Sequence, residues 1–138
     1  MDIEAIRKYC MSLPGATQTL QWGDDLVFKI GGKMFVVLPL EPSAPTKLSF
    51  KCSPDKFYEL TERPDIIPAP YLARAQWVAL ERLEALSRAE LEELLRESYE
   101  LVCAKLPKKM QEQVRNPSRT KVAATTKGER RTRPKRRP

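Results

Sequence analysis

Apolar residues recur along the chain with two periods, which predict a helix at each end of a domain and strands between them. Near the amino terminus, Ile3, Ile6, Cys10 and Leu13 are spaced three and four apart, so they share one face of a helix. The Pro-Gly pair that follows Leu13 ends this helix. Cys10 lies on the apolar face, which predicts a small buried side chain rather than a reactive thiol.

A longer helix is predicted at the end of the domain, from Ser87 to Pro107. Residues 87–90 read Ser-Arg-Ala-Glu, the form of a capping box, in which the serine and glutamate side chains bind each other's backbone N–H groups. Pro107 closes this helix after about twenty residues. Its apolar stripe consists of Leu91, Leu94, Leu95, Ser98 and Val102.

Residues 18–38 are rich in Val, Ile, Leu and Phe and predict three strands. A Gly-Asp-Asp segment at 23–25 and the pair Gly31-Gly32 separate them, and the paired glycines supply the positive φ that a two-residue hairpin turn needs. Such a turn fixes the register of the strands beside it. The expected pairs are Ile30 with Lys33, Lys29 with Met34, Phe28 with Phe35, Val27 with Val36, and Leu26 with Val37.

This register sorts the hairpin side chains onto two faces of a sheet. The face expected to meet the helices carries Leu26, Phe28, Ile30, Phe35 and Val37. The opposite, outer face is semi-apolar, so we expect part of it to be exposed and to offer a surface for a protein partner. It carries Val27, Lys29, Met34, Val36 and Leu38.

The middle of the chain predicts two more strands, at 46–52 and 76–81, and a helix at 53–63 that begins with a Ser-Pro-Asp cap. Trp77 and Ala79 share one face of the second of these strands. The segment 64–73 is too rich in proline for regular structure, so it must wrap over the surface or the sheet edge. The order predicts an α+β fold, with an antiparallel sheet packed against the N- and C-terminal helices in an α/β sandwich.

The charge distribution separates this domain from the end of the chain. The formal net charge is +7, yet residues 1–107 hold 13 Lys and Arg against 16 Asp and Glu, whereas residues 108–138 hold 12 against two. From residue 110 onward, low apolar content with repeated Thr, Lys, Arg and Pro predicts disorder. We therefore expect a domain at 1–109 and a disordered basic tail at 110–138 that adheres to polyanions.

Several classes of function lack their usual residues. The chain contains no histidine, which removes the commonest general base and most transition-metal ligands. Its three cysteines are far apart, as is typical of reduced thiols in the cytoplasm, and no apolar run is long enough to cross a membrane. We expect a cytoplasmic protein that is not an enzyme, needs no cofactor or metal, and does not enter a membrane.

Five short segments resemble the MmcQ/YjbR family of small bacterial domains, over about residues 1–109. They are SLPG at 12–15, LVFKIGGKMFVVL at 26–38, LSFKCSPD at 48–55, PAPYLARAQWVALE at 68–81 and ESYELVCAKLPKK at 97–109. The resemblance implies a CyaY-like helix–sheet sandwich and DNA binding through hairpins described as a double wing. Many members have a histidine directly before the tryptophan that corresponds to Trp77, where this chain has Gln76.

The tail and the resemblance together favour DNA as the partner, bound through backbone phosphates, because no recognition helix is evident. The candidates in the domain are Lys29 and Lys33 at the hairpin tip, Lys47 and Lys51 on the next strand, and Arg74. Lys108 and Lys109, at the end of the domain, are further candidates. The candidates in the tail are Arg130, Arg131, Arg133, Lys135, Arg136 and Arg137.

Two alternatives stay open from the sequence. Lysines that flank a turn are also typical of a solvated hairpin, and the net negative charge of the domain means that it can bind DNA only if its lysines lie on one side. The second alternative is a protein-interaction module that binds its partner at the outer sheet face, with the tail acting as a non-specific nucleic-acid tether.

Overall fold

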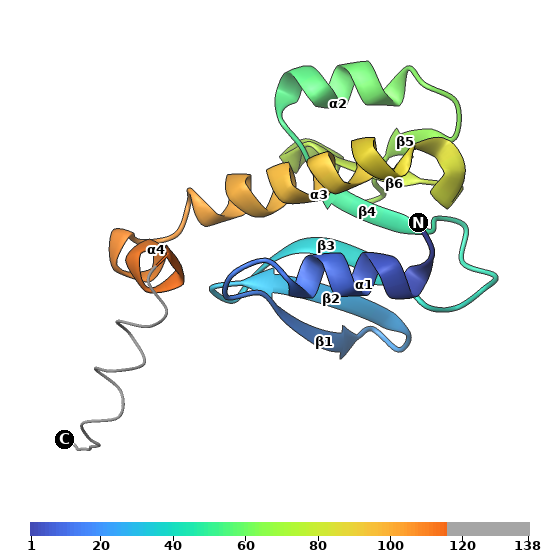
Figure 1. The fold of residues 1–138 in the computed structure, drawn as a ribbon. Coiled ribbons are helices and arrows are strands. Elements are labelled where there is room, and N and C mark those ends of the chain that lie inside the picture. Colours follow the sequence, from blue (N-terminus) through green and yellow to red (C-terminus); the bar gives the residue numbers. More distant parts are fainter. Residues whose placement is uncertain (116–138) are drawn as a thin grey trace. The chain divides into compact units, whose positions relative to one another are not determined.

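A computed structural model describes residues 1–115 of the chain, which divides into two compact units, Met1–Lys105 and Leu106–Pro138. The first unit contains the sheet and three α-helices, as Figure 1 shows. Its helices are α1 (Ile3–Met11), α2 (Pro54–Thr61) and α3 (Arg88–Cys103), with short 3-10 turns η1 (Ala73–Ala75) and η2 (Leu83–Ala85). Its strands are β1 (Thr17–Gln21), β2 (Asp25–Ile30), β3 (Lys33–Pro39), β4 (Leu48–Lys51), β5 (Ile66–Pro68) and β6 (Trp77–Leu80).

The six strands form one antiparallel sheet in the order β1-β2-β3-β4-β6-β5. Helix α3 packs against β3 and β4 and contacts α1, while α2 packs against β5 and β6. Figure 1 shows α1 and α3 crossing the same face of the sheet. The α+β sandwich predicted from the sequence is therefore confirmed.

Polar side chains fix the starts of the helices, as their sequence signatures predict. The Asp2 carboxylate accepts a hydrogen bond from the Ala5 backbone N–H at 2.8 Å. At α3, Ser87 Oγ accepts from the Glu90 N–H at 3.2 Å, and the Glu90 carboxylate accepts from the Ser87 N–H, so the capping box is complete. The helix ends at Cys103, earlier than the expected closure at Pro107.

The predicted register of the β2–β3 hairpin holds only beside its turn. Ile30 pairs with Lys33 and Lys29 with Met34, but Phe28 then pairs with Val36 instead of Phe35. The extra residue, Phe35, makes a β-bulge, which places two residues of one strand opposite one residue of its partner. Every pair farther from the turn is shifted by one position, so the expected pairs of Val27 and Leu26 are also wrong.

The bulge changes which side chains reach the outer face of the sheet. Val36 and Leu38, expected on that face, are fully buried on the helix side, because they pair with Phe28 and Leu26. Val37 takes the outer position beside Val27. The semi-apolar surface that the sequence offered to a protein partner is therefore not formed as expected.

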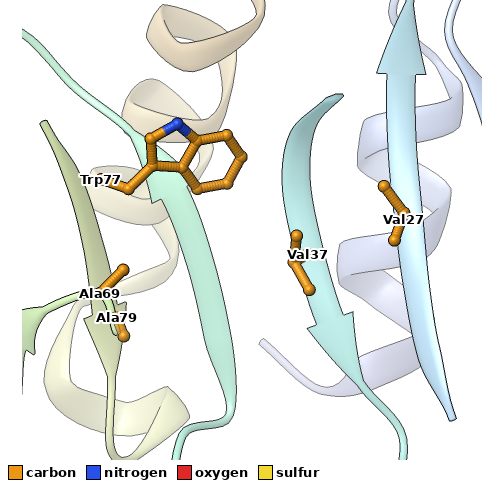
Figure 2. Close-up of a cluster of buried hydrophobic side chains, with 5 residues drawn as sticks. All are labelled: Val27, Val37, Ala69, Trp77 and Ala79. Carbon is orange, nitrogen blue, oxygen red and sulfur yellow. The ribbon is translucent and has the colours of Figure 1, made fainter. Parts of the chain in front are cut away.

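The outer face carries a small apolar cluster of its own. Trp77 is only 4% exposed, and in Figure 2 its indole extends from β6 across the neighbouring strand β4. The loop after β5 contributes to the same cluster, which closes the centre of this face against solvent. The buried members are Val27, Val37, Ala69, Trp77 and Ala79, with Met34, Ile67 and Leu72 packed against them.

Ser98 of α3 joins the two strands that the bulge separates. Its hydroxyl donates to the Phe35 carbonyl at 2.6 Å and accepts from the Lys51 backbone N–H at 3.0 Å. Regular pairing of β3 with β4 runs through Val36–Phe50 and Val37–Ser49, so Phe35 and Lys51 would be the next pair. A fully buried serine takes the place of that missing pair of the ladder.

Two boundaries differ from the sequence prediction. Residues 66–68, expected to be irregular, form the edge strand β5, where Pro68 is tolerated because an edge strand leaves one side of its backbone unpaired. In the second unit, helix α4 spans Lys108–Arg115, which includes the first six residues of the segment expected to be disordered. The rest of the predicted tail, residues 116–138, lies outside the described residues.

Candidate anion-binding site

Four strands of the first unit have one end at the edge of the sheet where the Gly31-Gly32 turn lies. Because neighbouring strands are antiparallel, β2 and β4 end there, while β3 and β6 begin there. Gly31 and Gly32 have φ values of 59° and 80°, as the predicted turn requires. Strand ends of this kind bring side chains from distant parts of the sequence into one place.

A hollow of about 340 Å³ lies at this end of the sheet. We call it the lysine hollow, because three of its six lining residues are lysines, each from a different element. Lys33 follows the hairpin turn, Lys51 ends β4, and Lys105 follows α3. The complete lining is Lys33, Met34, Lys51, Trp77, Val102 and Lys105.

The described residues contain no acidic partner for the positive charge of the lysine hollow. No Asp or Glu lines the hollow, and within residues 1–115 none of its lysines forms an ion pair with a carboxylate. Lys51 Nζ donates to the Ala75 carbonyl at 2.6 Å. Since an ammonium group has three N–H donors, this hydrogen bond holds Lys51 in place and leaves donors for a ligand.

The surroundings of Lys51 disfavour its own charge. Partial burial lowers the pKa of the Lys51 ammonium group, and the positive charge of Lys105 lowers it further. The two positive charges repel each other, and an anion bound between them would reduce this repulsion.

The loop beside the hollow adds an arginine and an exposed aromatic ring. Ala75, the partner of Lys51, belongs to η1, next to the exposed Arg74. Tyr71, in the same loop, is fully exposed and has a φ of 67°, a conformation that is unusual for a bulky residue. On the outer face of the sheet, Lys29 pairs with Met34, so it lies one strand away from the hollow.

Gln76 occupies the position directly before Trp77. It caps η1 in the left-handed region, with a φ of 60°, and its carbonyl accepts a hydrogen bond from the Cys52 backbone N–H at 2.9 Å. The backbone of this residue therefore links the loop to the end of β4. This chain has no imidazole there.

Among the other predicted DNA-binding residues of the first unit, Lys47 lies away from the hollow. Lys47 lies at the opposite end of β4 from Lys51, and its Nζ donates to the carbonyls of Pro42 and Ala44, both at 2.8 Å. Lys108 and Lys109 are exposed in α4 of the second unit. The other candidates, Arg130, Arg131, Arg133, Lys135, Arg136 and Arg137, lie outside the described residues.

Lys105 was missed because its place depends on the packing of α3 across the sheet. Its sequence signal is the basic segment at 105–109, whose first lysine immediately follows the apolar stripe of α3. That signal marks the end of the helix, but it does not show that Lys105 lies near the β2–β3 hairpin.

A second hollow, between α2 and α3, is also charged, but each of its bases is paired with a glutamate, and Glu93 and Glu97 give its lining an excess of acids. Arg63 and Glu90 are 2.9 Å apart, Lys56 and Glu59 are 3.5 Å apart, and Arg96 pairs with Glu100. Paired surface charges of this kind are typical of solvated helix faces. We therefore take the lysine hollow as the candidate site.

Residues 1–115 were also compared with what a metal site, a reactive thiol or a membrane-spanning helix requires. No group of three His, Cys, Asp or Glu residues within 1–115 could hold a metal ion. Cys10, Cys52 and Cys103 are buried and unpaired, and burial raises the pKa of Cys10 to about 12 and that of Cys52 to about 11. Among the helices of these residues, none has the length and apolar character that crossing a membrane requires.

Comparison with known proteins places the fold in a family. A YjbR family model matches residues 11–101. The Escherichia coli O157:H7 protein named "Uncharacterized protein YbdF" is 30% identical over 115 residues, which cover 81% of this chain and 93% of that protein.

Solved structures agree with this match. The Deinococcus radiodurans protein DR2400 superposes with a TM-score of 0.72 at 30% identity, covering 81% of this chain and 86% of its own. A Pseudomonas syringae protein shares the fold with a TM-score of 0.62 at 20% identity, covering 74% of this chain and 99% of its own. The chain belongs to the YjbR family.

Proposed function

We propose that this protein binds DNA through its phosphates, without a catalytic step, and that the lysine hollow is the part of the domain that meets them. The observation that carries the proposal is the convergence of Lys33, Lys51 and Lys105 on one hollow that no carboxylate lines. A lysine cluster without counterions gains free energy from phosphates, because binding releases the cations condensed on the nucleic acid.

The surroundings of the hollow support binding beyond the three lysines. Arg74 and Lys29 lie on the loop and strand beside it, so a strand of nucleic acid at the hollow meets further positive charge. Tyr71 presents a fully exposed ring, and exposed aromatic rings stack on bases without regard to sequence. These features support phosphate-directed binding rather than reading of base edges.

The basic end of the chain adds a second source of affinity. Residues 108–138 hold 12 Lys and Arg against two acids, and such a segment neutralises phosphates in any conformation. The contribution of the hollow must therefore be measured where the tail does not mask it.

The test is a fluorescence-anisotropy titration of a labelled duplex with the full-length chain over a series of salt concentrations. A tail-neutralised background carries Gln at ten positions, which leaves two bases against two acids in residues 108–138. The positions are Arg115, Arg119, Lys121, Lys127, Arg130, Arg131, Arg133, Lys135, Arg136 and Arg137. In that background, we expect Lys33→Gln, Lys51→Gln and Lys105→Gln together to weaken binding. The log–log salt slope should become shallower by about 0.9 for each phosphate that the protein no longer neutralises.

The control is Lys47→Gln, which is compared with Lys51→Gln alone, because each removes one positive charge and the two lysines lie at opposite ends of β4. We expect it to leave both the affinity and the salt slope close to those of the tail-neutralised parent. The proposal fails if that parent does not bind duplex DNA, or if it binds equally well with and without the three lysines of the hollow.

A further inference from the structure

The size and charge of the lysine hollow specify its ligand more narrowly than a nucleic-acid backbone. A volume of about 340 Å³ is at the small end of ligand pockets and suits one charged group with a small attachment. Three ammonium groups around so small a space outnumber the single negative charge of a phosphodiester. A terminal phosphate is a better match, since at neutral pH a phosphomonoester carries a charge of about −1.5 to −2.

We infer that the lysine hollow binds a phosphomonoester, either the phosphorylated end of a nucleic-acid strand or the phosphate of a free mononucleotide. For strand ends this inference rests on the proposed function and names the group that the site selects. Lys33, Lys51 and Lys105, which all line the hollow, are the donors to the phosphate oxygens.

The apolar part of the lining limits how a ligand enters. Met34, Trp77 and Val102 supply the rest of the hollow; none of them carries a charge, and the indole N–H of Trp77 is the one conventional side-chain hydrogen-bond donor among them. A phosphodiester within a strand must leave the site in two directions, whereas a terminal phosphate is attached on one side. The mixed lining of lysines and apolar side chains therefore favours a terminal group.

The electrostatics of the hollow itself point the same way. Burial and the neighbouring charge of Lys105 both lower the pKa of the Lys51 ammonium group. A dianion compensates this unfavourable charge arrangement more completely than a monoanion does. Held by the Ala75 carbonyl, the Lys51 ammonium group needs no rearrangement to meet it.

Trp77 provides a direct readout of binding. The chain has two tryptophans, and Trp22, which is 65% exposed, lies at the β1–β2 turn at the other end of the strands. In a Trp22→Phe background, the indole fluorescence reports from the wall of the hollow. This background is used for all small-molecule titrations.

The first arm compares three probes: thymidine 5′-monophosphate, its methyl phosphodiester and thymidine. We expect the monoester to change the Trp77 fluorescence and to bind about tenfold more tightly than the diester, with no response to thymidine. Lys51→Gln and Lys105→Gln should each weaken the monoester, and the control Lys47→Gln should not. Equal affinity for monoester and diester, or no binding of either, overturns the inference.

The second arm measures pH dependence. The phosphomonoester loses its second negative charge near pH 6, so its affinity should fall several-fold between about pH 7.5 and pH 5.5. No histidine of the chain titrates in this range, and any added protonation of Lys51 would strengthen binding instead. A pH-independent affinity contradicts the inference, because the monoanion would then be held as well as the dianion.

The third arm tests whether the phosphomonoester comes from the end of a nucleic-acid strand or from a free mononucleotide. It also distinguishes failure of this inference from failure of DNA binding. In the tail-neutralised background, a single strand with a 5′-phosphate is compared with the same strand ending in a 5′-hydroxyl. Tighter binding of the phosphorylated strand assigns the hollow to strand ends, and a response to the mononucleotide alone assigns it to free nucleotides. If both strands bind equally and the mononucleotide does not bind, the inference fails while DNA binding stands.

Discussion

A single buried hydroxyl, that of Ser98, connects the last helix of the first unit to two strands that do not pair at that point. It donates to the Phe35 carbonyl and accepts from the Lys51 N–H, with no exposure to water. Because Lys51 also lines the hollow, the same hydroxyl helps to position β4 where the hollow is built.

Replacing this hydroxyl should be costly. In Ser98→Ala, the buried Phe35 carbonyl and the part-buried Lys51 N–H both lose their partner, which costs about 1–3 kcal/mol for each buried group left unsatisfied and less where water can replace the partner. We expect the free energy of unfolding, measured by urea denaturation, to fall by at least about 1 kcal/mol. Ser43→Ala, in an exposed loop, is the control and should change it by less than about 0.5 kcal/mol. Equal effects of the two changes would mean that Ser98 is not a structural link.

The buried thiol of Cys10 predicts how stability depends on pH. Burial raises its pKa from 9.0 to about 12, so the native state keeps a proton that the unfolded state releases above pH 9. This contribution to stability is complete below pH 9 and is lost as the pH rises toward 12, by up to about 1.4 kcal/mol per pH unit. The free energy of unfolding of Cys10→Ala, measured from about pH 8 to pH 10.5, should therefore be lower overall but decline less steeply. Parallel curves for the two proteins would contradict the assignment.

At the scale of elements, local sequence signals were enough to predict most of the fold. The capping box at Ser87 and the Ser-Pro start of α2 mark helix beginnings by local hydrogen bonding, and the structure confirms both. The Gly31-Gly32 turn was equally readable, because positive φ is a local requirement. Short-range chemistry therefore accounts for the order of elements and for the ends of the elements whose caps are explicit.

What could not be predicted depends on packing between distant segments. The bulge at Phe35 is accommodated by Ser98 and by Tyr99, whose ring meets that of Phe35 edge-on at 5.5 Å, and both come from a helix more than 50 residues further along the chain. The outer-face residues were misassigned for that reason. In the site, the sequence named Lys33, Lys47 and Lys51 as candidates without showing that they lie together. Lys33 and Lys51 line one hollow, whereas Lys47 lies elsewhere, and the place of Lys105 depends on where α3 ends.

The turn itself allows a test of backbone strain without any change in packing. A Cβ atom on Gly32 would meet nothing within 4 Å, so Gly32→Ala is opposed only by the φ of 80°. We expect it to lower the free energy of unfolding by about 1 kcal/mol, measured by urea denaturation. Gly32→Asn, a residue that tolerates this conformation better, should cost less. A larger loss for Asn than for Ala would indicate that something other than φ controls the turn.

At the scale of the whole molecule, the described charges fall into two arrangements. On the helices and the loop after α2, Arg7, Arg63, Arg88 and Arg96 are each paired with a glutamate. The lysines of the hollow have no such partners in residues 1–115, although residues 1–107 contain more acids than bases. The contrast, within the described part of the chain, between these paired arginines and the unpaired lysines of the hollow supports the proposed anion-binding role of the hollow.

This arrangement predicts that stability and binding respond to Lys105 in opposite directions. Replacing Lys105 by Gln removes its repulsion of Lys51, and replacing it by Glu substitutes attraction, so the melting temperature should rise stepwise from Lys to Gln to Glu. Because Lys105 is exposed to solvent, the increase in the free energy of unfolding should be only about 0.5 kcal/mol at low salt. It should become smaller as added salt screens the charges. Over the same series, affinity for thymidine 5′-monophosphate should fall, as measured by Trp77 fluorescence in the Trp22→Phe background.

The melting temperatures of the three proteins are measured by differential scanning fluorimetry at low and high salt. If the two properties instead fall together, Lys105 contributes to folding and the charge of the hollow is not reserved for a ligand.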